Sequence, residues 1–145
     1  MNDTRSKTPL VLMEQVIMGL VFALAAALCV QAFVQARNLS IASVERDHAM
    51  NISQTLAEYA KAYRGDMPLM QEELGGEISE ESLLLYFDSE WNYVSDLKEA
   101  SYIACFAPEE GEEFCRYGNI TVRHVKEEKV ISSMKTAWQE VSGNE

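Results

Sequence analysis

The amino-acid sequence predicts an α+β fold, in which a long N-terminal membrane-spanning helix packs its outer half on an antiparallel sheet of about four strands. Three observations predict it. Residues 15–36 form a run of 22 without a charged side chain. A helical pattern then continues without a proline as far as Arg64. Beyond Gly76, short apolar runs of strand length alternate with polar turns.

The uncharged run is long enough to cross a membrane. As a helix it spans about 33 Å, and the hydrocarbon core of a bilayer is about 30 Å thick. Arg5 and Lys7 precede the run and favour a cytoplasmic N-terminus. We therefore expect a single-pass protein of the cytoplasmic membrane. A cleaved secretory signal, cut after Ala36, is the alternative, but the run is longer than the usual apolar region of a signal peptide.

The helix is expected to continue well beyond the membrane. After Arg37, apolar side chains recur mostly three and four residues apart, the pattern of an amphipathic helix that covers a sheet. Lys61 suits the last turn of this helix, and Gly65 suits the position that follows it. The apolar stripe consists of Ile41, Val44, Ile52, Leu56, Tyr59 and Tyr63, with His48 in the gap.

Shorter elements follow the long helix. Asp66 suits the N-cap of a short helix that ends at Gly75. Apolar runs then predict an antiparallel meander. Its expected strands are residues 82–87, 102–107, 114–126 and 130–139, with a further extended segment at 91–94. Pro108 to Gly111 reads as the turn between the second and third strands.

Composition and motifs argue against several functions. The net charge of −11 falls on the part after Ala36, and an acidic surface repels nucleic acid. A glycine-rich phosphate loop, a nucleophile elbow and a zinc motif are missing, so we expect no enzyme, cofactor or metal. His48 and His124 fall on different elements and are interpreted as structural. The pairs of glutamates lack the order of a calcium loop and are interpreted as solvated turns.

Glu14 is the only charged residue between Lys7 and Arg37. A carboxylate in hydrocarbon costs a few kcal/mol and usually needs a partner. Glu14 could therefore pair with a cation of a neighbouring subunit during assembly. It could equally lie hydrated among lipid headgroups, because Lys7 is only seven residues away. Its position alone leaves both interpretations open.

The stretch LVLME at residues 10–14, followed by a long helix rich in Ala and Leu, resembles the N-terminus of type IV pilins and type II secretion pseudopilins. The resemblance implies a cytoplasmic leader at residues 1–9, a transmembrane segment at 10–36 and an extracytoplasmic head at 37–145. It implies that Leu10 is the first mature residue and that Glu14 neutralises a partner's N-terminal amine. It also implies other pilin-like subunits, membrane lipid and the prepilin peptidase as partners.

One position departs from the family pattern. The family's leader ends in Gly or Ala, whereas this chain has Pro9, which restricts both itself and the residue before it. Processing between Pro9 and Leu10 is therefore in question. Three interpretations remain: a cleaved, atypical minor pilin or pseudopilin, an uncleaved pilin-like protein, and an unrelated bitopic accessory or sensor protein with a small partner-binding domain.

Two of the three cysteines are candidates for a disulfide bond. Cys105 and Cys115 fall on adjacent predicted strands, and a turn centred between Pro108 and Glu112 would let them face each other. Outside the membrane such a pair can form a cross-strand disulfide. The alternative is two small buried thiols. Cys29 lies in the membrane run and is expected to serve packing.

Overall fold

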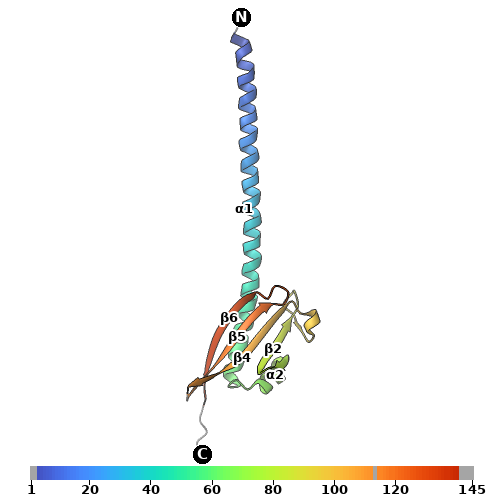
Figure 1. Cartoon of the computed structure of the whole chain (residues 1–145), viewed down its shortest axis with the longest axis vertical. Helices are drawn as coiled ribbons and strands as arrows, with labels where there is room; N and C mark the ends of the chain where they lie inside the picture. The colour runs from blue at the N-terminus through green and yellow to red at the C-terminus, as the bar shows by residue number, and fades with distance from the viewer. Residues whose placement is uncertain (1–2, 113, 141–145) are drawn as a thin grey trace, which may run out of the picture. The chain divides into compact units, whose positions relative to one another are not determined.

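The computed structural model describes residues 3–112 and 114–140. Helix α1 runs from Asp3 to Ala62 without interruption (Figure 1). The chain divides into two compact units, and the boundary lies between Ser43 and Val44. The first unit therefore contains only helix among its described residues. The second unit contains the C-terminal part of α1, the helix α2 (Met67–Leu74) and the sheet.

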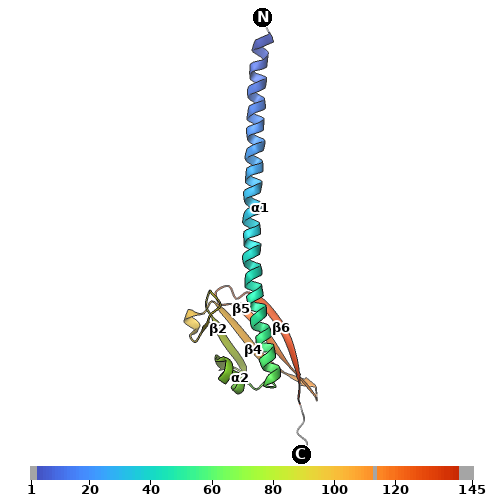
Figure 2. The same cartoon turned by 180° about the vertical axis from the view of Figure 1, so that it is seen from behind.

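The sheet is antiparallel throughout, with the strand order β1-β2-β4-β5-β6, and β3 pairs with β2 outside this path. Its strands are β1 (Glu77–Ser79), β2 (Ser82–Phe87), β3 (Tyr93–Val94), β4 (Tyr102–Glu112), β5 (Cys115–His124) and β6 (Val130–Gln139), and a 3-10 turn, η1 (Leu97–Glu99), precedes β4. The C-terminal part of α1 covers one face (Figure 2). The predicted α+β class is confirmed, with six strands instead of about four.

Small side chains make up much of the face of α1 that packs on the sheet. Ala49, Ser53, Ala57 and Ala60 are all buried, at spacings of three and four that place them on one helix face. They surround Leu56, the large buried side chain of this face. Alternate residues of each strand meet them from the sheet. These are Leu83, Leu85, Ala104, Phe106, Ile120, Val122 and Trp138.

The predicted apolar stripe packs against the sheet only in its C-terminal part, from Ile52 onward. Ile52, Tyr59 and Tyr63 pack against the core, as expected. Ile41 and Val44, however, remain 59% and 53% exposed. The buried apolar contact between α1 and the sheet therefore begins near Ala49.

The end of α1 follows the sequence signals closely. Gly65 has a φ of +74°, and its N–H donates to the carbonyl of Ala60 at 2.8 Å. A Cβ at Gly65 would lie 2.3 Å from the Trp138 ring, so glycine is also required for packing. Asp66 then caps α2 by accepting a hydrogen bond from the N–H of Leu69 at 3.3 Å. The predicted Asp66 cap is confirmed, but the first left-handed residue after α1 is Arg64, with a φ of +52°, and Gly65 follows it one position later than predicted.

The hairpin between β4 and β5 corrects the sequence prediction. Pro108 to Gly111 is not a turn, because β4 continues to Glu112. Pro108 pairs with Gly118, and Glu112 pairs with Cys115. The pairing of β4 with β2 ends at Phe106. Beyond that residue β4 has a neighbour on one side only, an edge position at which a strand tolerates proline.

Candidate functional site

Glu14 lies on an exposed apolar face of α1. Together with its neighbours one helical turn away it lines a shallow hollow of about 350 Å³. The other lining residues are Leu10, Met13, Ile17 and Met18. Within the described residues, α1 is the one helix long and apolar enough to cross a membrane, and its most apolar window is entirely unburied. The face around Glu14 is therefore open to lipid or to another chain.

The apolar surface of α1 does not stop where the uncharged run ends. Leu39, Ile41 and Val44 lie beyond Ala36 and are all more than half exposed. Crossing a bilayer does not require these side chains, because residues 15–36 are already long enough. Among the described residues, nothing in the chain covers them.

The proposed processing position lies inside the helix. Pro9 and Leu10 are both residues of α1, which begins at Asp3. Proline is tolerated in the first turn of a helix but disturbs the hydrogen bonding further in. Cleavage between Pro9 and Leu10 stays a prediction.

The predicted pairing of Cys105 with Cys115 is wrong in this structure. Cys105 lies opposite Thr121, whereas Cys115 lies opposite Glu112 on β4 and Gln139 on β6. Six positions along β5 separate Thr121 from Cys115, about 20 Å at about 3.4 Å per residue. A disulfide needs Cα atoms within about 7 Å of each other. All three cysteines are free thiols. Cys105 and Cys115 do not face each other because β4 continues past Pro108 as far as Glu112.

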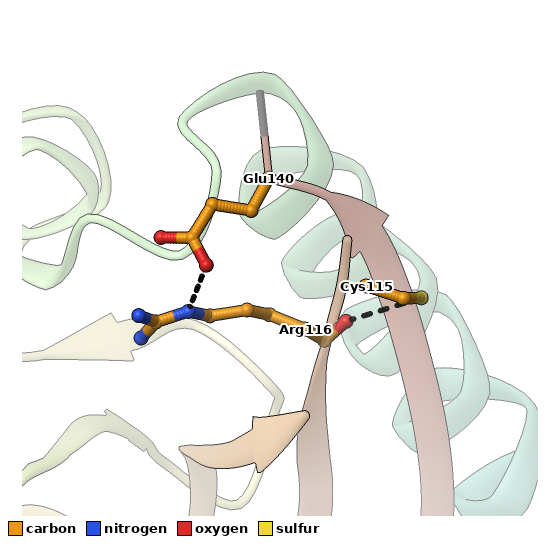
Figure 3. Close-up of polar contacts among 3 residues, drawn as sticks. All are labelled: Cys115, Arg116 and Glu140. Atoms are coloured by element: carbon orange, nitrogen blue, oxygen red, sulfur yellow. Dashed lines mark hydrogen bonds and ion pairs between the residues drawn. The ribbon is translucent and has the colours of Figure 1, made fainter. Parts of the chain in front are cut away.

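Near Cys115, an exposed ion pair joins the start of β5 to the residue that follows β6 (Figure 3). The Nε of Arg116 donates to Oε2 of Glu140 at 2.7 Å, and the Cys115 thiol lies 4.0 Å from the Arg116 carbonyl oxygen. Both charged side chains are about half exposed, so the ion pair contributes little to stability. A hydrogen bond with Cys115 raises the pKa of the nearby Tyr117. The contact between Arg116 and Glu140 therefore links the first residues of β5 to the end of β6.

The structure places the two histidines at opposite ends of one row of four rings. The ring of His48, on α1, stacks on Trp91 with centroids 5.5 Å apart. Trp91 stacks on Tyr102 at 3.8 Å, and the edge of Tyr102 meets His124 at 5.1 Å. Ring contacts between distant segments leave no local signal, so sequence reasoning missed this stack. The described residues hold no group of three or more metal-ligating side chains.

One small groove lies between α1, α2 and β2. Its volume is about 240 Å³, and apolar side chains dominate its wall. The lining residues are Ile52, Thr55, Leu56, Leu74, Leu85, Phe87 and Tyr93. Tyr93 has a second role, because its hydroxyl oxygen accepts a hydrogen bond from the N–H of Gly76 at 2.7 Å. The groove could hold an apolar side chain of a partner.

Comparison with protein-family models, with curated proteins and with solved structures finds no match to this chain. The architecture therefore rests on the structure itself. A long apolar N-terminal helix packs its C-terminal part on an antiparallel sheet, and this arrangement is pilin-like. The same helix is consistent with a single-pass membrane anchor.

Proposed function

We propose that this chain is a minor pilin or pseudopilin-like structural subunit of a type IV pilus or a type II secretion-like assembly. The observation that carries the proposal is the exposed apolar surface of α1 over residues 10–36, where Glu14 is the single carboxylate. In an assembly, helices of neighbouring subunits would cover this surface. The partners would be other pilin-like subunits, and the protein would have no catalytic activity.

Glu14 has a defined role in this proposal. Once another helix covers the hollow around it, the side chains of Leu10, Met13 and Ile17 exclude water from the carboxylate. A buried charge requires a partner of opposite sign. The N-terminal amine of a neighbouring subunit supplies that charge, and the pair then fixes the relative height of the two helices.

The location follows from the same helix. The apolar run anchors the chain in the cytoplasmic membrane with its N-terminus inside, and the second unit lies outside. From there the subunit enters an extracellular filament or its membrane-bound base. Removal of the leader before Leu10 would be the work of a prepilin peptidase.

A second function is favoured by the groove of about 240 Å³ in the second unit. A bitopic accessory or sensor protein would use such a groove to bind a partner segment outside the membrane. It would need the apolar run only as an anchor. Glu14 would then remain hydrated near the headgroups, and a neutral side chain would replace it without consequence.

Substitution of Glu14 in the native host separates the two functions. Glu14→Gln keeps the shape and removes the charge, and Gln15→Asn is a matched control at the next position. After crosslinking in the membrane, we expect Glu14→Gln to lose its pilin-like partners, because breaking one side of a buried pair costs about 3–5 kcal/mol. Gln15→Asn should retain them. Equal recovery of partners from both variants would contradict the assembly function and favour the anchored accessory protein.

A further inference from the structure

Helix α1 contacts the sheet in two chemically different ways. Between Ala49 and Ala60 the contact is a buried core of small and apolar side chains. Just before Ala49 the contact is made by Glu45 and His48, which touch aromatic rings at the ends of three strands. Val44 beside them is half exposed, and of the two rings only Trp91 reaches the edge of the apolar core.

The aromatic rings on the sheet side come from separate segments. Trp91 lies in the turn between β2 and β3, and Tyr102 is the first residue of β4. Their rings are nearly parallel, with centroids 3.8 Å apart and an interplanar angle of 12°. His48 continues the stack from the helix side, at 5.5 Å and 14° from Trp91. A residue of α1 thus extends a stack that begins in the sheet.

Glu45 provides the second contact. The pKa of Tyr102 is raised to about 12, first by burial, then by a hydrogen bond to the Glu45 carboxylate and its charge, and last by the charge of Glu127. The phenol is therefore neutral at physiological pH, and its O–H donates a hydrogen bond to the Glu45 carboxylate. Since Glu45 and His48 are three residues apart on a helix, they lie on the same face.

The turn that carries Trp91 is held in an unfavourable conformation. Trp91 has a φ of +65°, a region that a bulky residue rarely adopts. The carboxylate of Asp88 fixes the turn by accepting hydrogen bonds from the N–H groups of Glu90 and Asn92, each at 2.9 Å. These bonds, with that of Asn92 first, lower the pKa of Asp88. The chain thus accepts local strain in order to present Trp91 to the helix.

We propose that Glu45, His48, Trp91 and Tyr102 form a latch that opens and closes while the core between Ala49 and Ala60 stays packed. Its contacts are polar, aromatic and partly exposed, the kind that open at low cost compared with a buried core. The latch begins one residue after Val44, where the second compact unit begins. The role of the latch rests on the proposed function. In an assembling subunit, an open latch frees the turn of α1 that carries Glu45 and His48 to adjust to the neighbouring subunits.

Hydroxyl-radical footprinting of the full chain in detergent micelles tests the latch. The readout is the labelling rate of the Trp91 and Tyr102 side chains, with the buried Trp138 as the internal reference for the core. The double variant Glu45→Ala, His48→Ala removes both helix contacts and retains helix propensity. The control Arg46→Ala, Asp47→Ala changes exposed neighbours on the same helical turn.

In the double variant we expect labelling of Trp91 and Tyr102 to rise about threefold or more, while Trp138 stays unchanged, because only the latch opens. The control should match the wild type. Unchanged labelling of Trp91 and Tyr102 would overturn the proposal, and so would a parallel rise at Trp138, which would mean that latch and core open together. The measurement uses no partner, so its failure leaves the assembly function untouched, and loss of partners from Glu14→Gln does not bear on it.

Discussion

Gly65 shows how one residue serves both the backbone and the core. Its positive φ continues the left-handed turn that Arg64 begins after α1, and its missing side chain leaves room for the ring of Trp138. Gly19, in contrast, lies on the apolar part of α1 with no atom within 4 Å of where a Cβ would stand. The two glycines therefore allow the same substitution to be compared in opposite environments.

We expect Gly65→Ala to lower the free energy of unfolding by about 1–3 kcal/mol, through left-handed strain and a clash with Trp138. Gly19→Ala should leave the unfolding of the second unit unchanged, since Gly19 belongs to the first unit. Thermal unfolding in micelles, followed by the near-ultraviolet signal of the tryptophans, measures both. A Gly65→Ala protein as stable as the wild type would refute this account of the helix end.

Tyr102 predicts an alkaline limit to stability. Its pKa is raised from the usual value of 10.0 to about 12, first by burial and then by Glu45. A group whose pKa is raised on folding binds its proton more tightly in the folded state. Its contribution to stability is therefore complete below pH 10 and is lost as the pH rises towards 12.

Ultraviolet titration of the phenols measures this limit. Wild-type protein should show one tyrosine that ionises above the others, and Tyr102→Phe should lack that step. The same variant should also lose less stability than the wild type between about pH 10 and 12, because it has no proton to release. If Tyr102→Phe retained the late step, the assignment to Tyr102 would be wrong.

At the scale of elements, the exposed segment of α1 beyond Ala36 distinguishes the two proposed functions, a simple membrane anchor and an assembly subunit. Leu39, Ile41 and Val44 lie beyond the run that is long enough to span the membrane, and the sheet does not cover them. Apolar side chains left open in one chain are usually covered by another. This segment is therefore where helix packing between subunits would extend outside the bilayer.

Polar substitution in this segment gives the corresponding prediction. Ile41→Gln should leave membrane insertion intact, because residue 41 lies outside the uncharged run, but should lower the recovery of crosslinked partners several-fold. The control Ser40→Gln introduces the same side chain beside it and should have little effect. Membrane fractionation and crosslinking in the native host report the two properties separately. Full partner recovery from Ile41→Gln would show that the segment simply faces water.

Local sequence patterns predict α1, α2, β2 and β6 close to their observed bounds, since each is a continuous apolar or periodic stretch between polar or glycine-containing segments. The failures are at turns. Glu80 and Glu81 form the turn between β1 and β2 with φ of 48° and 64°, where sequence reasoning looks for Gly or Asn. Pro108 and Gly111 suggest a turn, yet Pro108 pairs with Gly118 of β5, and Gly111 lies at a register shift within β4 and not at its end. In both places tertiary pairing overrides the local preference of the residues.

The candidate site was predicted unevenly for a similar reason. Glu14 stands out because an apolar run isolates it, a purely local signal. The stack of His48, Trp91, Tyr102 and His124 joins residues up to 76 positions apart, and nothing in their spacing brings them together. The pairing of Cys105 with Cys115 failed because it depended on the misplaced turn.

For the whole molecule, the decisive property is the state of its N-terminus. If the leader is removed, the mature chain starts at Leu10 and its new amine lies four residues from Glu14. Intact-mass analysis of protein from the native host should then show the loss of residues 1–9. A full-length mass would exclude the cleaved pilin and would leave the uncleaved and bitopic forms.

The two separated thiols outside the membrane run have a consequence for how the protein can be produced. Since Cys105 and Cys115 lie far apart on the sheet, the native state contains no covalent bridge that an oxidant must install. The second unit holds its shape by burial, backbone pairing and side-chain contacts without a disulfide. We therefore expect its unfolding temperature to be the same with and without a thiol reductant.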